Sequence, residues 1–74
     1  MKYNPDTECQ KLIQNIRQLC KEKNIKMNKL AQKAEISPST ISEILNDRSN
    51  PQVYTLFKIC NALECSVGEL FGEE

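Results

Sequence analysis

Histidine is absent from this 74-residue sequence, and glycine occurs only twice. The first absence removes the side chain that most often serves as a general base, and the second leaves no glycine-rich loop to hold a phosphate. The sequence also offers no clear pairing of a nucleophile with a base. It therefore predicts neither an enzyme nor a bound cofactor.

A metal site is also disfavoured. The four cysteines show no C-x-x-C spacing, so without histidine a zinc ion would need an all-thiolate site of unusual geometry. We expect no metal and reduced thiols that act as small apolar packing residues. A redox role is an alternative, since Cys60 and Cys65 lie five apart across a turn, but a bridge there would disturb the core. The cysteines are Cys9, Cys20, Cys60 and Cys65.

No long apolar run is present, which excludes a transmembrane helix, and the first six residues do not resemble a secretory signal. We therefore expect a cytoplasmic protein. The length suits one domain with a thin core. We expect residues 1–6 to form a flexible leader and residues 7–74 to form a single domain.

Net charge is zero, but the charges are unevenly distributed. Seven positive residues and one negative residue lie between Lys11 and Lys33, whereas four negative residues and no positive one follow Ile59. A domain with one basic and one acidic end can orient itself on a nucleic acid while remaining neutral overall. The alternative is that the lysines only form a solvated surface.

Apolar residues recur at helical spacing in five segments, at about 7–23, 27–34, 38–46, 53–63 and 66–71. Asn24 can end the first helix in a left-handed conformation. Lys26 is a poor cap for the second helix, whereas Ser66 and Glu69 form a capping box for the fifth. The buried side expected for the fourth helix consists of Val53, Leu56, Phe57, Cys60 and Leu63.

The third helix has the clearest start, with Ser37 as its cap and Pro38 at the first helical position. Ile41, Ile44 and Leu45 share one side. The other side then carries short hydrogen-bonding residues that suit a DNA major groove. The alternative is an ordinary surface helix.

The second and third helices, joined by a short turn, have the spacing of a helix-turn-helix. The ordered residues resemble the phage-repressor and Cro-type (XRE-like) helix-turn-helix family from about Ile16 to Phe71. This resemblance implies an all-α, compact five-helix, lambda-repressor-like DNA-binding domain. It is carried by Leu30-Ala31, Ile36-Ser37, Thr40-Ile41-Ser42, Pro51, Thr55-Leu56, Ile59, Ala62-Leu63 and Glu69-Leu70-Phe71.

The resemblance also implies that the helix at 38–46 enters the major groove. The residues expected to face bases are Pro38, Ser39, Thr40, Ser42 and Glu43. The residues expected to face phosphates are Arg17, Lys26, Met27, Asn28, Lys29, Asn46, Arg48 and Asn50.

Two departures from the family pattern stand out. Members usually have a phosphate-anchoring glutamine where this chain has Met27, so Lys26 or Lys29 would have to bind that phosphate instead. Many members also pair an arginine late in the first helix with a glutamate near the end of the third. Here these positions are Cys20 and Leu45, and replacing both charges by apolar groups preserves stability where removing one would not. We therefore expect Cys20 and Leu45 to touch.

The function implied is a sequence-specific regulator of transcription, acting as a repressor, that binds double-stranded DNA as a homodimer on a palindromic operator. Its dimer surface is expected near the fifth helix, with Phe71 and Tyr54. The alternative is a protein-interaction module with weak DNA affinity, such as an antitoxin whose partner is a toxin or another regulator. Zero net charge, Met27 and Glu43 favour that alternative.

Overall fold

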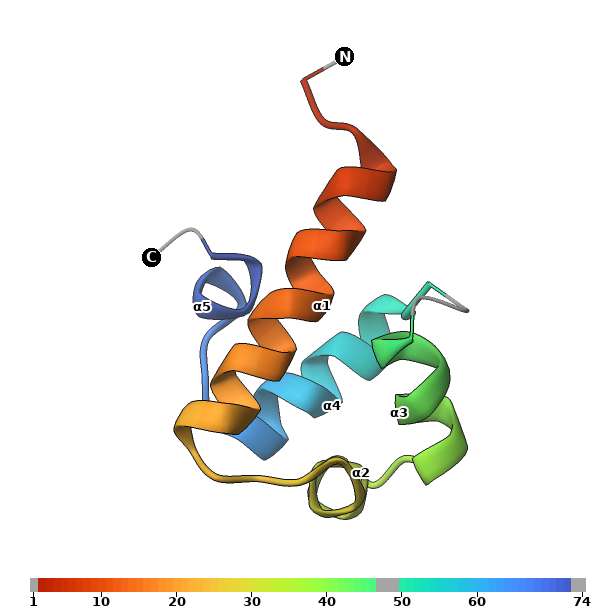
Figure 1. Ribbon diagram of the computed structural model, residues 1–74, viewed down its shortest axis with the longest axis vertical. Helices are drawn as coiled ribbons and strands as arrows, with labels where there is room; N and C mark the ends of the chain where they lie inside the picture. The colour runs from red at the N-terminus through yellow and green to blue at the C-terminus, as the bar shows by residue number, and fades with distance from the viewer. Residues whose placement is uncertain (1, 47–49, 73–74) are drawn as a thin grey trace.

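Five α-helices form the fold in the computed structural model, which describes residues 2–46 and 50–72. Across these ranges no strand occurs, so the all-α prediction is confirmed. The longest helix, α1, runs obliquely through the molecule, with α5 on one side of it, α3 on the other, and α2, seen end-on, at the bottom of the view (Figure 1). The helices are α1 Pro5–Glu22, α2 Met27–Ala34, α3 Pro38–Leu45, α4 Val53–Leu63 and α5 Val67–Phe71.

Helix α1 begins at Pro5, two residues before the expected start at Thr7. The Asn4 side chain explains the difference, because its Oδ1 accepts from the amides of Asp6 at 3.0 Å and Thr7 at 3.2 Å. Residues 5 and 6, expected in the leader, therefore belong to the helix. At the other end Asn24 adopts the expected left-handed conformation, with φ of 56°.

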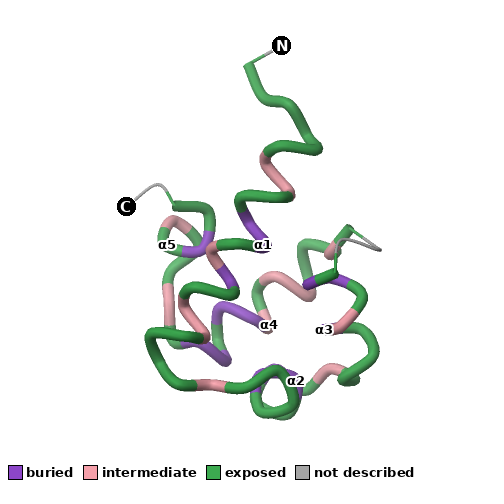
Figure 2. Tube along the Cα trace, in the orientation of Figure 1, coloured by how far each residue is buried: buried purple, intermediate pink, exposed green. Residues whose placement is uncertain are grey.

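The core draws apolar side chains from all five helices. Figure 2 marks the buried positions along the chain, whereas the first turns of α1 contain only exposed and intermediate positions. Since α1 contributes its first buried side chain at Leu12, its N-terminal end projects beyond the core. The core cluster consists of Leu12, Ile13, Ile16, Leu30, Ala31, Ala34, Ile41, Leu45, Ile59, Cys60, Ala62, Leu63 and Leu70.

The side of α4 that faces the core differs in part from the prediction. Cys60 and Leu63 are buried and Leu56 packs against the core, as expected. Val53 and Phe57 were expected inside, but they are 67% and 54% exposed. Ile59 and Ala62 are buried instead. Helix α4 is apolar on more than one side, so periodicity alone does not fix its orientation, and packing against α2 and α5 does.

Side chains from one helix close the last turn of another at three places. Arg17 Nη2 on α1 donates to the Leu45 carbonyl of α3 at 2.7 Å. Asn15 Nδ2, also on α1, donates to the Leu70 carbonyl of α5 at 3.0 Å. Lys58 Nζ on α4 donates to the Glu35 carbonyl after α2 at 3.4 Å. Carbonyls at a helix end lack intrahelical partners, so these bonds satisfy them while tying the helices together.

No helix in the described part of the chain is both long and apolar enough to cross a lipid bilayer.

Candidate nucleic-acid interface

Helix α3 starts in a network of hydroxyl groups. The Ser37 Oγ accepts from the Thr40 amide at 3.2 Å, which confirms the expected cap. The same oxygen lies 2.7 Å from Thr40 Oγ1 and 3.2 Å from Ser39 Oγ. Because each hydroxyl offers one donor and two acceptors, Ser39 and Thr40 retain capacity for an outside partner. Ser37 thus orients two residues of the expected base-facing set, a role that was not predicted.

The residues expected to face bases share the outer side of α3. Pro38, Ser39, Thr40 and Glu43 are exposed, and Ser42 is half-buried. The buried residues of the same helix are the three that periodicity indicates, Ile41, Ile44 and Leu45. The sequence therefore predicts both sides of α3 correctly, and the contact of the outer side with bases stays a prediction.

The end of α3 holds one candidate phosphate ligand close to the helix. Asn46 Nδ2 donates to the Ser42 carbonyl at 2.8 Å and to Ser42 Oγ at 3.2 Å. This folds the Asn46 amide nitrogen back on the helix and leaves its Oδ1 as the acceptor. Arg48 lies outside the described residues. Asn50 is exposed and, with Thr40 and four others, lines a pocket of about 350 Å³ between α3 and the start of α4.

Helices α2 and α4 begin without a side-chain cap. Neither Lys26 nor Gln52, the two N-cap residues, accepts a hydrogen bond from its helix, in contrast to Ser37 of α3. Among the described residues, no side chain accepts from the first amides of α2 and α4, and such amides bind anions well. The residues expected to contact phosphate at the start of α2 are all exposed, namely Lys26, Met27, Asn28 and Lys29.

The Arg17 side chain forms a hydrogen bond within the protein. Its Nη2 donates to the Leu45 carbonyl at 2.7 Å, so at least one of its five N–H donors is engaged within the chain. Cys20 and Leu45 line one cavity of about 250 Å³, as positions that face each other across α1 and α3 should. Arg17 and Lys21 line the same cavity. Direct contact of Cys20 with Leu45 and a phosphate contact by Arg17 stay predictions.

Partial or full burial favours the neutral form of three of the thiols. Burial raises the pKa of Cys65 to about 11, with the neighbouring Cys60 and Glu69 adding to the effect. Burial also raises the pKa of Cys20, against the lowering effect of Arg17, and that of Cys60. All four cysteines are free, and in the described ranges no cluster of three or more potential ligands could hold a metal ion.

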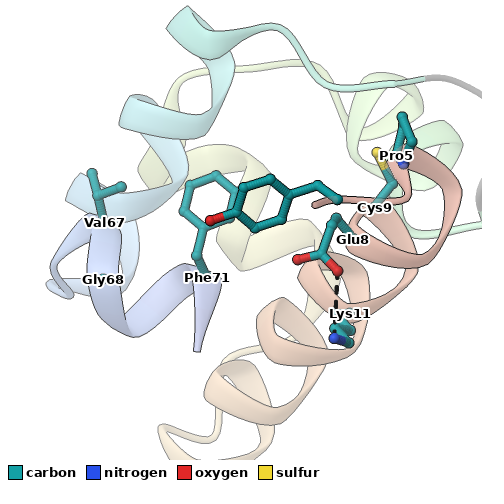
Figure 3. Close-up of a pocket in the computed structure, with 8 residues that line it drawn as sticks. Pro5, Glu8, Cys9, Lys11, Val67, Gly68 and Phe71 are labelled. Atoms are coloured by element: carbon teal, nitrogen blue, oxygen red, sulfur yellow. Dashed lines mark ion pairs between the residues drawn. The ribbon is translucent and has the colours of Figure 1, made fainter. Parts of the chain in front are cut away.

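A second exposed surface is apolar, and of its residues on α4 only Tyr54 was expected on the outside. It consists of Val53, Tyr54, Phe57, Val67 and Phe71, each between 41% and 71% exposed, and we call it the apolar surface. Phe71 and Val67 also line a pocket of about 470 Å³ between α5 and the projecting end of α1, where Pro5 and Cys9 form the opposite wall (Figure 3). The signal available in the sequence was the excess of apolar residues in α4, more than one buried side requires.

Residues 15–73 match the family of Cro/C1-type helix-turn-helix DNA-binding domains, so the chain belongs to this family. The family binds DNA and is not enzymatic. The chain is also similar to the immunity repressor protein of Bacillus phage phi105, with 38% identity over 61 residues, which cover 82% of this chain and 42% of that relative. The chain thus spans less than half the length of the curated relative it matches. No solved structure gives a significant match.

Proposed function

We propose that the chain is a transcriptional repressor that binds a palindromic operator as a homodimer, with α3 in the major groove. The observation that carries this proposal is the outer side of α3, where Ser39, Thr40 and Glu43 are exposed together. Its dimensions also suit the groove, because a single helix with short polar side chains fits the width of the B-DNA major groove.

Base reading by this surface is moderate in strength. A serine hydroxyl donates to or accepts from any base, and the Glu43 carboxylate accepts from the cytosine amino group. The outer side of α3 carries no arginine, asparagine or glutamine at the base-facing positions, the types that form bidentate bonds with guanine or adenine. DNA shape and phosphate contacts therefore supply much of the specificity.

Phosphate contacts are proposed at the two uncapped helix starts. The amides at the start of α2 are flanked by Lys26 and Lys29, whose positive charges attract the phosphate that the apolar Met27 cannot bind. Those at the start of α4 follow Asn50 and border the pocket shared with Thr40. Removal of a lysine that contacts a phosphate should weaken binding to all DNA sequences alike. It should also reduce the number of ions released on binding, read from the salt dependence of the affinity, by about one.

The apolar surface supports the homodimer. Exposed apolar patches of this kind are typical of protein interfaces, and Phe and Tyr are enriched at their centres. Helices α3 and α5 lie on opposite sides of the molecule (Figure 1), so a partner on α5 leaves α3 free for DNA. A two-fold axis near Val67 and Phe71 would pair the recognition helices about 34 Å apart, one turn of DNA.

Selection of bound duplexes from a randomised DNA pool at near-physiological salt tests the proposal. We expect a palindrome whose half-sites lie one helical turn apart, and sedimentation equilibrium should show dimers. Ser39→Ala and Glu43→Gln should change the preferred bases within each half-site. Recovery of no sequence, with binding that disappears as salt rises, would reduce the interaction to phosphate attraction and contradict the proposal.

The second candidate is a protein-interaction module with weak DNA affinity, such as an antitoxin. The apolar surface favours it too, because a different protein can cover the same residues, and the net charge of zero weakens non-specific attraction to DNA. A monomer in solution that selects no DNA sequence would favour this candidate. A dimer that selects a palindrome would exclude it as the main function.

A further inference from the structure

We propose that Arg17 is a positioning residue for the recognition helix, which it holds in place through the Leu45 main-chain carbonyl. This inference rests on the proposed function, because it assigns to Arg17 an effect on operator recognition. The bond joins α1 to the last residue of α3 across 28 positions of sequence at 2.7 Å. That is a short distance for a hydrogen bond from a guanidinium, the strong charge-assisted type.

The bond lies at the end of α3, where the buried Ile44 and Leu45 supply apolar packing and the bond adds a polar link to another helix. The start of α3 is fixed by the Ser37 cap, and its middle by the fully buried Ile41. Helix α3 packs mainly on α2 and less on α1. At its end, the Asn46 side chain bonds to Ser42 of the same helix. Among the described residues, Arg17 provides the side-chain hydrogen bond that ties this end to another helix.

The position of that end decides which bases Glu43 and Ser42 can reach. An eight-residue helix is about 12 Å long, so a tilt of about 5° around its start moves its end by about 1 Å. Hydrogen bonds tolerate a range of only about 0.5 Å in distance. Removal of the Arg17 bond would thus disturb base reading without any change in the residues that touch DNA.

The charge of Arg17 also suits this place. Carbonyls at a helix end carry partial negative charge, and a cation there is stabilising. The last turn of α3 contains no basic residue of its own. Cys20 and Leu45, which line the cavity beside Arg17, supply packing but no charge. Arg17 therefore supplies from α1 the positive charge that the end of α3 lacks.

The test compares Arg17→Met, which keeps an unbranched apolar stem but removes the guanidinium donors, with Lys21→Met. Lys21 lies one turn further along α1, lines the same cavity and carries the same charge, but it makes no bond to Leu45. Arg17→Lys keeps the charge and one possible donor. Full-length wild type and the three variants are measured without DNA by amide hydrogen exchange, and with DNA by titration of the selected duplex and of a random duplex.

We expect Arg17→Met to lower amide protection in the last turn of α3 selectively, with α2 and α4 unchanged. It should also reduce the ratio of specific to non-specific affinity by about tenfold or more, the usual effect of a hydrogen bond to a charged group. Lys21→Met should leave that ratio and the protection of α3 unchanged, and Arg17→Lys should recover part of both.

Three results would overturn the inference. Equal ratios for Arg17→Met and Lys21→Met would make Arg17 an ordinary phosphate ligand. A decrease in amide protection spread evenly through all helices would mean that Arg17 only stabilises the protein in general. If Arg17→Lys recovered neither protection nor the affinity ratio, the effect would not depend on a charged donor at position 17. If wild type selects no DNA sequence, the proposed function fails, while the exchange measurement still decides whether Arg17 fixes the end of α3.

Discussion

Helices α3 and α4 have similar inner sides and very different outer sides. Ile41 of α3 and Ile59 of α4 are both completely buried. Outside, α3 presents hydroxyl groups and a carboxylate, whereas α4 presents Val53, Tyr54 and Phe57. The inner side of each helix must be apolar because it packs in the core, so these sides are determined by the fold. The exposed sides do not have to be apolar for folding, so their composition indicates function.

The largest expected effects come from the inner sides, where the two helices should behave alike. Ile41→Ala and Ile59→Ala should each lower the free energy of unfolding by about 2–5 kcal/mol, because each removes buried methyl groups and leaves a cavity. Urea denaturation measures both. Ile41→Val and Ile59→Val serve as controls and should cost about 0.5–1.5 kcal/mol each. A cost near zero at either alanine variant would show that the two inner sides are not equivalent.

On the outer sides the two helices should differ. Phe57→Ser should raise the dissociation constant of the dimer by about tenfold or more, since central aromatic residues dominate interface energies. The stability of the monomer should change by no more than about 0.5 kcal/mol, because Phe57 is 54% exposed. Sedimentation equilibrium measures the first quantity and urea denaturation the second.

Ser39→Ala on α3 is the matched control for Phe57→Ser. It also alters an exposed side chain but should leave association unchanged. An unchanged dimer in Phe57→Ser would remove the apolar surface from the proposed interface.

The start of α3 gives a smaller contrast, between two neighbouring serines. Ser37→Ala should destabilise the protein by about 1 kcal/mol, because the Thr40 amide loses the oxygen that caps it at 3.2 Å. Ser39→Ala should change the free energy of unfolding by no more than about 0.5 kcal/mol, since the Ser39 Oγ caps no helix amide. Thermal unfolding of both variants distinguishes them. Equal melting temperatures would mean that the cap contributes nothing to the stability of α3.

The smallest effect is the pH dependence of stability caused by Cys65, which follows the end of α4. The pKa of Cys65 rises from 9.0 to about 11 in the folded state, chiefly through burial, so the folded form retains a proton that the unfolded chain has lost. This contribution to stability is complete below about pH 9 and is lost as pH rises to about 11. Cys65→Ser should therefore flatten the decline of stability in that window relative to wild type. An equally steep decline in the variant would contradict the assignment.

Much of this fold is predictable from sequence because local signals agree with packing. Helices α2 and α4 have the bounds that periodicity predicts, and Ser37 and Ser66 form the expected caps. The orientation of α4 was predictable only in part: Cys60 and Leu63 are buried as expected, but the excess of apolar residues wrongly placed Val53 and Phe57 inside. The Arg17 bond was not predictable either, because its acceptor is a main-chain atom and leaves no trace in the residue type at position 45.

That acceptor has a consequence for how such a sequence can change over generations. An ion pair between two side chains depends on both residues, and removal of one partner leaves a buried charge unpaired. A main-chain carbonyl is present whichever residue occupies position 45. The bond from Arg17 can therefore join α1 to α3 whether position 45 carries leucine or another residue. A search for paired substitutions between these helices would not detect the contact.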